Sequence, residues 1–198
     1  MSEKEIKVVG GTAATVKIAE SAVAKLPWLV NPILQSMATI LSPFDRHLRL
    51  NILLWEDKLC ELEVPKLRRL RDHQGRIHPS VINASGERAA FFLLQRNFPF
   101  WQYLVELKEI DCVFARKLEG VGRVRCAIDV EDLNIIKAQL ASKHEANIKL
   151  RSEILSLSDT DPRALVRTSW VITKRNLLRD LATKFIDVKM AAAPPPVQ

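Results

Sequence analysis

A stripe of apolar residues between positions 44 and 62 constrains the fold more than any other feature of this sequence. Its members recur every three or four residues, which is the spacing of one face of an α-helix. They are Phe44, Leu48, Ile52, Trp55, Leu59 and Leu62. Ser42-Pro43 is a typical helix start, because proline loses no hydrogen bond at the first helical position. The stripe therefore predicts a well-buried helix from Pro43 to about Glu63.

Other segments also carry helical signals. An Ala-rich stretch and a second apolar stretch, each preceding a proline, predict a helical arm over residues 1–42. A further helix is expected to start near Ser85, and a long polar one near Val130. Asp161-Pro162 repeats the cap-plus-proline start and predicts a last helix. The tail 191–198 has no core-forming residue and is expected to be disordered.

Residues 111–130 form the strongest candidate for β-structure. Two segments with alternating apolar residues flank a loop that contains Gly120 and Gly122, and glycines tolerate the backbone angles of a tight turn. The sequence therefore predicts an α+β fold that is predominantly α-helical with one β-hairpin, at about 111–130. This α-rich domain is expected to span residues 43–190.

Composition restricts the compartment and the partners. The chain has 30 Lys+Arg against 23 Asp+Glu, a net charge of +7, which favours acidic partners. Its three cysteines show no CxxC spacing, so buried thiols are expected rather than disulfides or a zinc knuckle. The first residues lack the pattern of a secretory signal, and a cytoplasmic location is expected.

The motifs of common catalytic centres do not occur. The sequence contains no GxGxxG, GxxxxGK[ST], HExxH or GxSxG, and its four histidines are scattered. Clusters of acidic residues near 129–132 and 159–161 lie at expected helix starts, where carboxylates stabilise the helix dipole. We therefore expect no enzyme activity, no cofactor and no metal.

Cationic residues provide the main functional hypothesis. Arginine suits phosphate recognition because its planar guanidinium donates paired hydrogen bonds. The predicted binding residues are Lys66, Arg68, Arg69, Arg71, Arg76, Lys117, Arg123 and Arg125. If they converge on one face, they would form a surface for a polyanion, bound mainly through its backbone. The sequence thus predicts a non-enzymatic regulatory or accessory protein that contacts nucleic acid, RNA in particular.

A second hypothesis uses the uncharged stretch 26–44. Its residues Trp28, Leu29, Ile33 and Leu34 could insert into a membrane interface or a partner groove, with basic residues touching acidic headgroups. The protein would then be a membrane-peripheral or protein-scaffolding module. Neither hypothesis specifies the oligomeric state.

A third hypothesis rests on a short pattern. Arg68 and His73 form R-x4-H, which resembles the motif of HEPN-type ribonucleases over six residues. That resemblance implies that arginine would hold the scissile phosphate and histidine would act as acid and base. An RNA-cleaving enzyme is therefore kept as an alternative.

Overall fold

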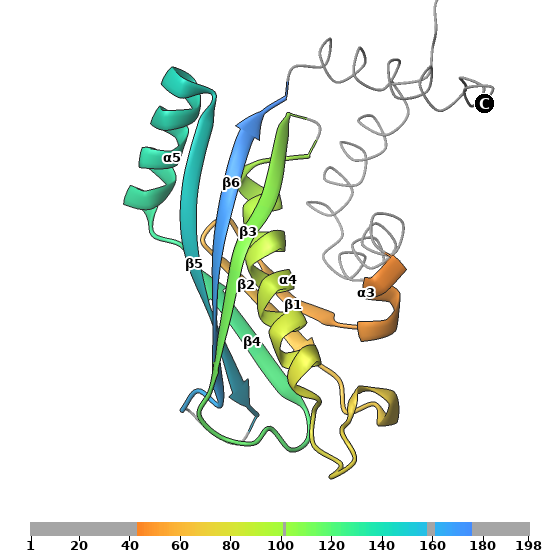
Figure 1. Ribbon diagram of the computed structural model, residues 1–198. Helices are drawn as coiled ribbons and strands as arrows, with labels where there is room; N and C mark the ends of the chain where they lie inside the picture. Colours follow the sequence, from red (N-terminus) through yellow and green to blue (C-terminus); the bar gives the residue numbers. More distant parts are fainter. Residues whose placement is uncertain (1–42, 101, 158–160, 176–198) are drawn as a thin grey trace, which may run out of the picture.

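A six-stranded antiparallel sheet is the main feature of the computed structural model, which describes residues 43–100, 102–157 and 161–175 (Figure 1). The strands lie in the order β1-β2-β4-β5-β6-β3, so β1 and β3 form its two edges. Their bounds are β1 (Asn51–Trp55), β2 (Leu59–Val64), β3 (Tyr103–Phe114), β4 (Gly122–Ala127), β5 (Glu145–Ser156) and β6 (Ala164–Lys174).

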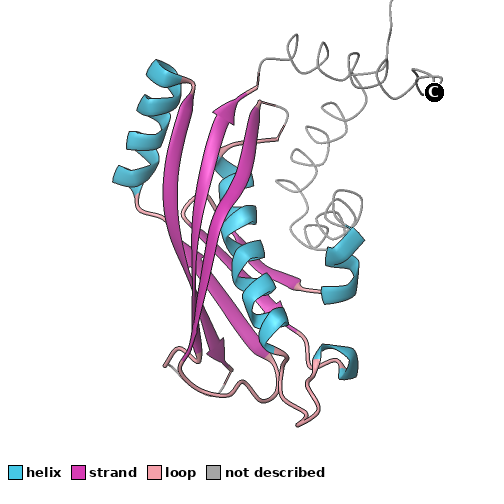
Figure 2. Ribbon diagram, in the orientation of Figure 1, coloured by secondary structure: helices cyan, strands magenta, loops and turns pink. Residues whose placement is uncertain are grey.

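One long helix packs along one face of this sheet (Figure 2). This is α4 (Pro79–Asn97), which contacts all six strands. The shorter helices of the described chain are α3 (Pro43–Leu48), the 3-10 turn η2 (Arg68–Leu70) and α5 (Val130–Lys143). Buried leucine and isoleucine side chains of α5 pack it against β5.

Strict alternation places the core between α4 and the sheet. In β6, every second residue from Ala164 to Ile172 is buried, while Leu165 and Arg167 point the other way. β5 alternates in the same manner. Successive side chains of a strand point to opposite faces, so this pattern buries one face and leaves charged residues on the other.

The predicted predominantly helical fold is therefore wrong, and the stripe from 44 to 62 shows why. Only Pro43–Leu48 is helical; β1 and β2 follow and pair with each other through Trp55 and Cys60. The polar residues Glu56, Asp57 and Lys58 form the turn between them. Spacings of three and four across this turn matched a helix, although two strands with a polar turn satisfy the same sequence.

The predicted hairpin at 111–130 is also wrong. Both segments contain strand, but they are not partners: β3 pairs with β6, whereas β4 lies between β2 and β5. The connection through Gly120 crosses the lower end of the sheet in Figure 1 instead of forming a tight turn. Glycines allow a loop to turn, but they do not determine which strands pair.

Two segments that were expected to be helical contain long strands. The helix at Val130 ends at Lys143, and β5 occupies the region where it was expected to continue. The segment after Asp161-Pro162 forms β6. Val166 and Trp170 are four residues apart, a spacing that fits both an alternating strand and a helix, and the β-branched residues Val166, Thr168, Val171, Ile172 and Thr173 favour the strand.

Several predictions lie outside the described residues. These are the helical arm 1–42 with Trp28, Leu29, Ile33 and Leu34, and the tail 191–198. Within the described ranges, no helix is both long and apolar enough to cross a membrane.

The closest approach of α4 to the sheet occurs at Gly86. A Cβ placed on this residue would lie 2.5 Å from the Cβ of Val166 in β6. The Ser152 hydroxyl of β5 donates a hydrogen bond to the Gly86 carbonyl oxygen at 2.8 Å. Glycine is therefore required here because any side chain would push α4 away from β5 and β6.

We predict that Gly86→Ala destabilises the protein by about 1–3 kcal/mol, the usual cost of overpacking a core. At an unhindered helix position the same change would stabilise by about 1 kcal/mol, so the sign is diagnostic. Urea unfolding would measure the difference. The double variant Gly86→Ala/Val166→Ala should lose less stability than the sum of the single variants. A Gly86→Ala variant as stable as the parent would contradict this packing.

Candidate functional site

The residue before α4, His78, caps the start of this helix. His78 is the N-cap, its Nδ1 accepts a hydrogen bond from the Ser80 N–H at 3.1 Å, and Pro79 takes the first helical position. The Val81 N–H donates to the His78 carbonyl oxygen at 2.9 Å. The helix therefore begins six residues before Ser85, and its first amides already have partners.

The loop before α4 is built around the carboxylate of Asp72. One oxygen accepts hydrogen bonds from the Gln74 N–H at 2.8 Å and the Arg76 N–H at 3.0 Å. The other faces the Arg76 guanidinium, with Nη2 at 2.8 Å. Desolvation raises the pKa of Asp72, but the hydrogen bonds from Arg76 and Gln74 outweigh it, so the net pKa lies below its ordinary value.

A cavity of about 290 Å³ lies between this loop, the start of α4 and the end of β3. Arg76 and Lys117 line its polar side, and Pro79, Ile82 and Phe114 line its apolar side. The Ile77 N–H donates to the Leu118 carbonyl oxygen at 3.0 Å, which ties the two loops together. We call this space the α4 pocket.

A cationic rim, defined as Arg116, Lys117 and Arg163, adjoins the α4 pocket. These residues line a larger depression of about 670 Å³ that also includes Glu119 and Ser156. The N–H groups of Ala115 and Arg116 both donate to the Arg163 carbonyl oxygen at 2.9 Å, which holds the three cations at one end of the sheet. Arg116 also pairs with Asp161 at 3.5 Å, an exposed and therefore weak ion pair.

One flank of α4 carries a carboxylate toward β3 and β6. Asn83, Glu87 and Phe91 are four residues apart and so share one side of the helix. The Phe91 ring lies 6.0 Å from that of Trp170 in β6, whereas the opposite flank meets β1, where Trp55 Nε1 donates to the Phe92 carbonyl oxygen. We call this flank of α4, together with the stretch of the edge strand β3 that it faces, the α4–β3 seam.

Glu87 is the only acidic residue of α4. Its side chain is 17% exposed and pairs with Arg88 at 3.3 Å. The helix rise of 1.5 Å per residue places Glu87 roughly 7.5 Å along the axis from Ile82 in the α4 pocket. A half-buried carboxylate beside an apolar wall can act as a general base.

Apolar side chains of β3 form the outer wall of the seam. Leu107 and Ile110 pair in register with Trp170 and Thr168 of β6 on the α4 side of the sheet, and both are more than a third exposed. Cys112 is the next residue on this side, and desolvation, with a smaller effect of Asp111, raises the pKa of its thiol. This wall suits an apolar group rather than a polyanion.

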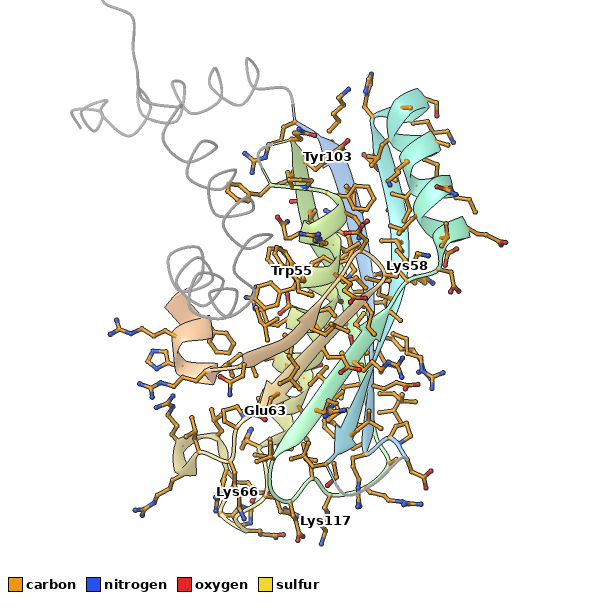
Figure 3. All side chains as sticks on the ribbon, turned by 180° about the vertical axis from the view of Figure 1, so that it is seen from behind. Trp55, Lys58, Glu63, Lys66, Tyr103 and Lys117 are labelled. Atoms are coloured by element: carbon orange, nitrogen blue, oxygen red, sulfur yellow. The ribbon has the colours of Figure 1, made fainter. Side chains whose placement is uncertain are left out.

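The structure separates the cationic residues that the sequence analysis grouped. Lys66 and Lys117 lie at the same end of the molecule (Figure 3), and Arg76 shares the α4 pocket with Lys117. Arg68 is exposed in η2. Arg69 and Arg71 donate hydrogen bonds to backbone carbonyl oxygens, those of His47 and Lys66.

Arg123 and Arg125 lie elsewhere, on the face of the sheet opposite α4. Their side of β4 is exposed, and Arg125 pairs with Glu61 of β2 at 3.6 Å. The single electropositive face on which the nucleic-acid hypothesis depended is therefore not formed by these residues. Sequence reasoning overlooked Asn83 and Glu87, although His78-Pro79 is a helix start that would have placed them on one flank.

The order of the strands and the helix laid along them are those of the hot-dog fold, and solved structures share it. One, a Pseudomonas aeruginosa protein of unknown function described as a "Probable Thioesterase", has a TM-score of 0.65 and 16% identity over 71% of this chain and 93% of that chain. A Chlorobaculum tepidum protein of unknown function has a TM-score of 0.65 and 17% identity, over 75% and 97%.

A variant of a thioesterase enzyme from Staphylococcus aureus gives a TM-score of 0.55 and 13% identity, over 67% of this chain and 99% of that chain. At these identities the likeness establishes the fold alone. No protein-family model and no curated protein matches the sequence.

These comparisons correct the functional expectations. The prediction of a non-enzymatic, nucleic-acid-binding regulator is contradicted, because the chain shares its fold with solved structures described as thioesterases and its described residues form mainly a sheet. The HEPN-like alternative fails as well: Arg68 and His73 lie in η2 and a tight turn, not in a long helix. The expectation of no enzyme is overturned by the same neighbours.

We predict that Asp72→Asn lowers stability at neutral pH and that this loss shrinks in acid. The folded pKa of Asp72 is below its ordinary value of 3.8, so its carboxylate stabilises the fold above that pH. The contribution disappears as the pH falls through the lower folded pKa. Urea unfolding of both proteins at pH 7 and pH 3 would measure the two differences. Equal differences at both pH values would contradict this role of the carboxylate.

Proposed function

We propose that this protein hydrolyses a thioester and that Glu87 is the general base. The observation that carries the proposal is the position of Glu87: a half-buried carboxylate on the flank of the central helix, facing a seam with an apolar wall. The fold shared with thioesterases supports the reaction type. A cytoplasmic location is part of this proposal.

Residue spacing supports the choice of Glu87 over Asp72. Crystal structures exist for two variants of the Staphylococcus aureus protein, one with a glutamine replaced and one with a glutamate replaced. The glutamate follows the glutamine by fifteen residues, so by spacing the glutamate corresponds to Glu87 and the glutamine to Asp72. Asp72 and Glu87 have the same spacing. The carboxylate of Asp72 is held by Arg76 and by backbone amides, so we assign it a structural role and leave the proton transfer to Glu87.

The chemistry requires one group that accepts and returns a proton. Glu87 takes a proton from water while the water oxygen bonds to the thioester carbonyl carbon. The carbon–sulfur bond of the tetrahedral intermediate then breaks, and Glu87 returns the proton to the leaving sulfur. The products are a carboxylic acid and a thiol. A thiol has a pKa of about 8.5 and leaves readily, so a single carboxylate suffices where an oxygen ester would need more help.

The surroundings of Glu87 divide between the two halves of such a substrate. The acyl group would lie against Leu107 and Ile110, because it is apolar. The thiol half would extend through the α4 pocket to the cationic rim. There, Lys117 and its two arginine neighbours suit phosphate groups, as found on coenzyme A.

We predict that Glu87→Gln lowers kcat by about 10²- to 10⁴-fold and changes KM little, because the amide cannot accept the proton. Release of free thiol from acyl thioesters of different chain lengths would measure this. The control is Glu153→Gln, which alters a carboxylate of β5 on the opposite face and should keep the parent rate. A Glu87→Gln variant with parental kcat would refute the assignment.

We predict that Lys117→Glu raises KM about tenfold for an acyl-coenzyme A, as expected for loss of one charge-assisted hydrogen bond worth about 1.5 kcal/mol. The same acyl group on pantetheine, which has no phosphate, should be hydrolysed as by the parent. Lys149→Glu reverses an exposed charge of β5 away from the rim and serves as the control. Equal effects on both substrates would exclude phosphate recognition by Lys117.

A further inference from the structure

The side chain of Thr168 places a hydroxyl group in the core of the protein. It is 2% exposed, and its Oγ1 has no hydrogen-bond partner among the residues that the structure describes. Buried polar groups in native proteins are nearly always paired, so an exception calls for an explanation. Valine has the same shape and would fill this place without a polar atom.

Two contacts fix the position of Thr168 relative to α4. Val166, two residues earlier in β6, meets Gly86, and Trp170, two residues later, meets Phe91. All three strand residues point to the same face. Thr168 therefore lies beneath the turn of α4 that begins at Glu87.

Other unpaired polar atoms lie along the same flank. Asn83 Oδ1 and Trp170 Nε1 are buried and have no partner within the described chain. Asn83 precedes Glu87 by one helical turn, and Trp170 follows Thr168 on β6. The floor of the α4–β3 seam thus offers an acceptor, a donor and a hydroxyl that can be either.

The β3 side of the seam is partly exposed to solvent. Ile110 is the register partner of Thr168 and is 36% exposed, and Leu107, the partner of Trp170, is 38% exposed. The part of the seam that solvent reaches is therefore its β3 side. The floor lies next to the one carboxylate of α4.

We propose that Thr168 is a positioning residue that holds the hydrolytic water for Glu87; this rests on the proposed function. The water donates one hydrogen to the Glu87 carboxylate and the other to Thr168 Oγ1, so its lone pair points to the thioester carbonyl carbon. No bond of Thr168 forms or breaks. Its effect is to fix the direction of attack.

The substitution Thr168→Val separates this role from a structural one. Loss of an aligned water should lower kcat about 10- to 100-fold with KM unchanged, while thermal stability stays equal or rises because an unpaired polar group is removed. Thr168→Ser keeps the hydroxyl and should retain most of the activity. Thr173→Val makes the same change on the other face of β6 and should leave kcat at the parental value.

A double variant tests whether Thr168 and Glu87 act on the same water. Glu87→Gln/Thr168→Val should be no slower than Glu87→Gln alone, because Thr168 acts only on the water that Glu87 activates. Multiplied losses would overturn the proposal. Parental kcat in Thr168→Val would overturn it and leave the proposed function intact. If the parent protein hydrolyses no thioester, both fail.

Discussion

The close contact of α4 with the sheet at Gly86 determines the rest of the structure. Here the helix rests on Val166, and the Ser152 hydroxyl binds the Gly86 carbonyl oxygen. A hydrogen bond to an interior helical carbonyl fixes the helix along its axis as well as its distance from the sheet. Because Glu87 is the next residue, its direction is set by backbone packing and not by a loop. Sites on regular elements hold their geometry better than sites on loops.

This contact belongs to a row of residues that crosses the sheet. Cys60, Cys126, Ser152, Val166 and Cys112 are successive register partners from β2 to β3. Burial raises the pKa of Cys126 to about 11, so its thiol stays neutral and packs as a small apolar group. Small residues along this row let α4 approach, and larger ones on either side support its flanks. One register thus positions both the helix and the wall of the seam.

The sequence allowed local features to be predicted but not their partners. The helix starts at Pro43 and Val130 and the burial of Cys60 and Cys126 depend on a few adjacent residues and are as expected, whereas the helix starts expected at Ser85 and after Asp161-Pro162 are not formed. The strand β6 was predicted to be a helix because the spacing of Val166 and Trp170 fits both a helix and a strand. The α4–β3 seam joins residues 83–91, 107–112 and 168–170. These segments are far apart in the sequence and form no short motif. The site can therefore be recognised only when the pairing of the strands is known.

The net charge of +7 misled because most cations of the sheet already have anionic neighbours. On the face opposite α4, Arg125 lies between Glu61 and Glu153 in register, and Arg167 pairs with Asp111 at 3.0 Å. Opposite charges on adjacent strands stabilise pairing and largely cancel at a distance. The cationic rim differs because its residues come from loops and crowd around a depression beside a pocket. The placement of charge beside the α4 pocket is therefore more informative here than the total charge of the chain.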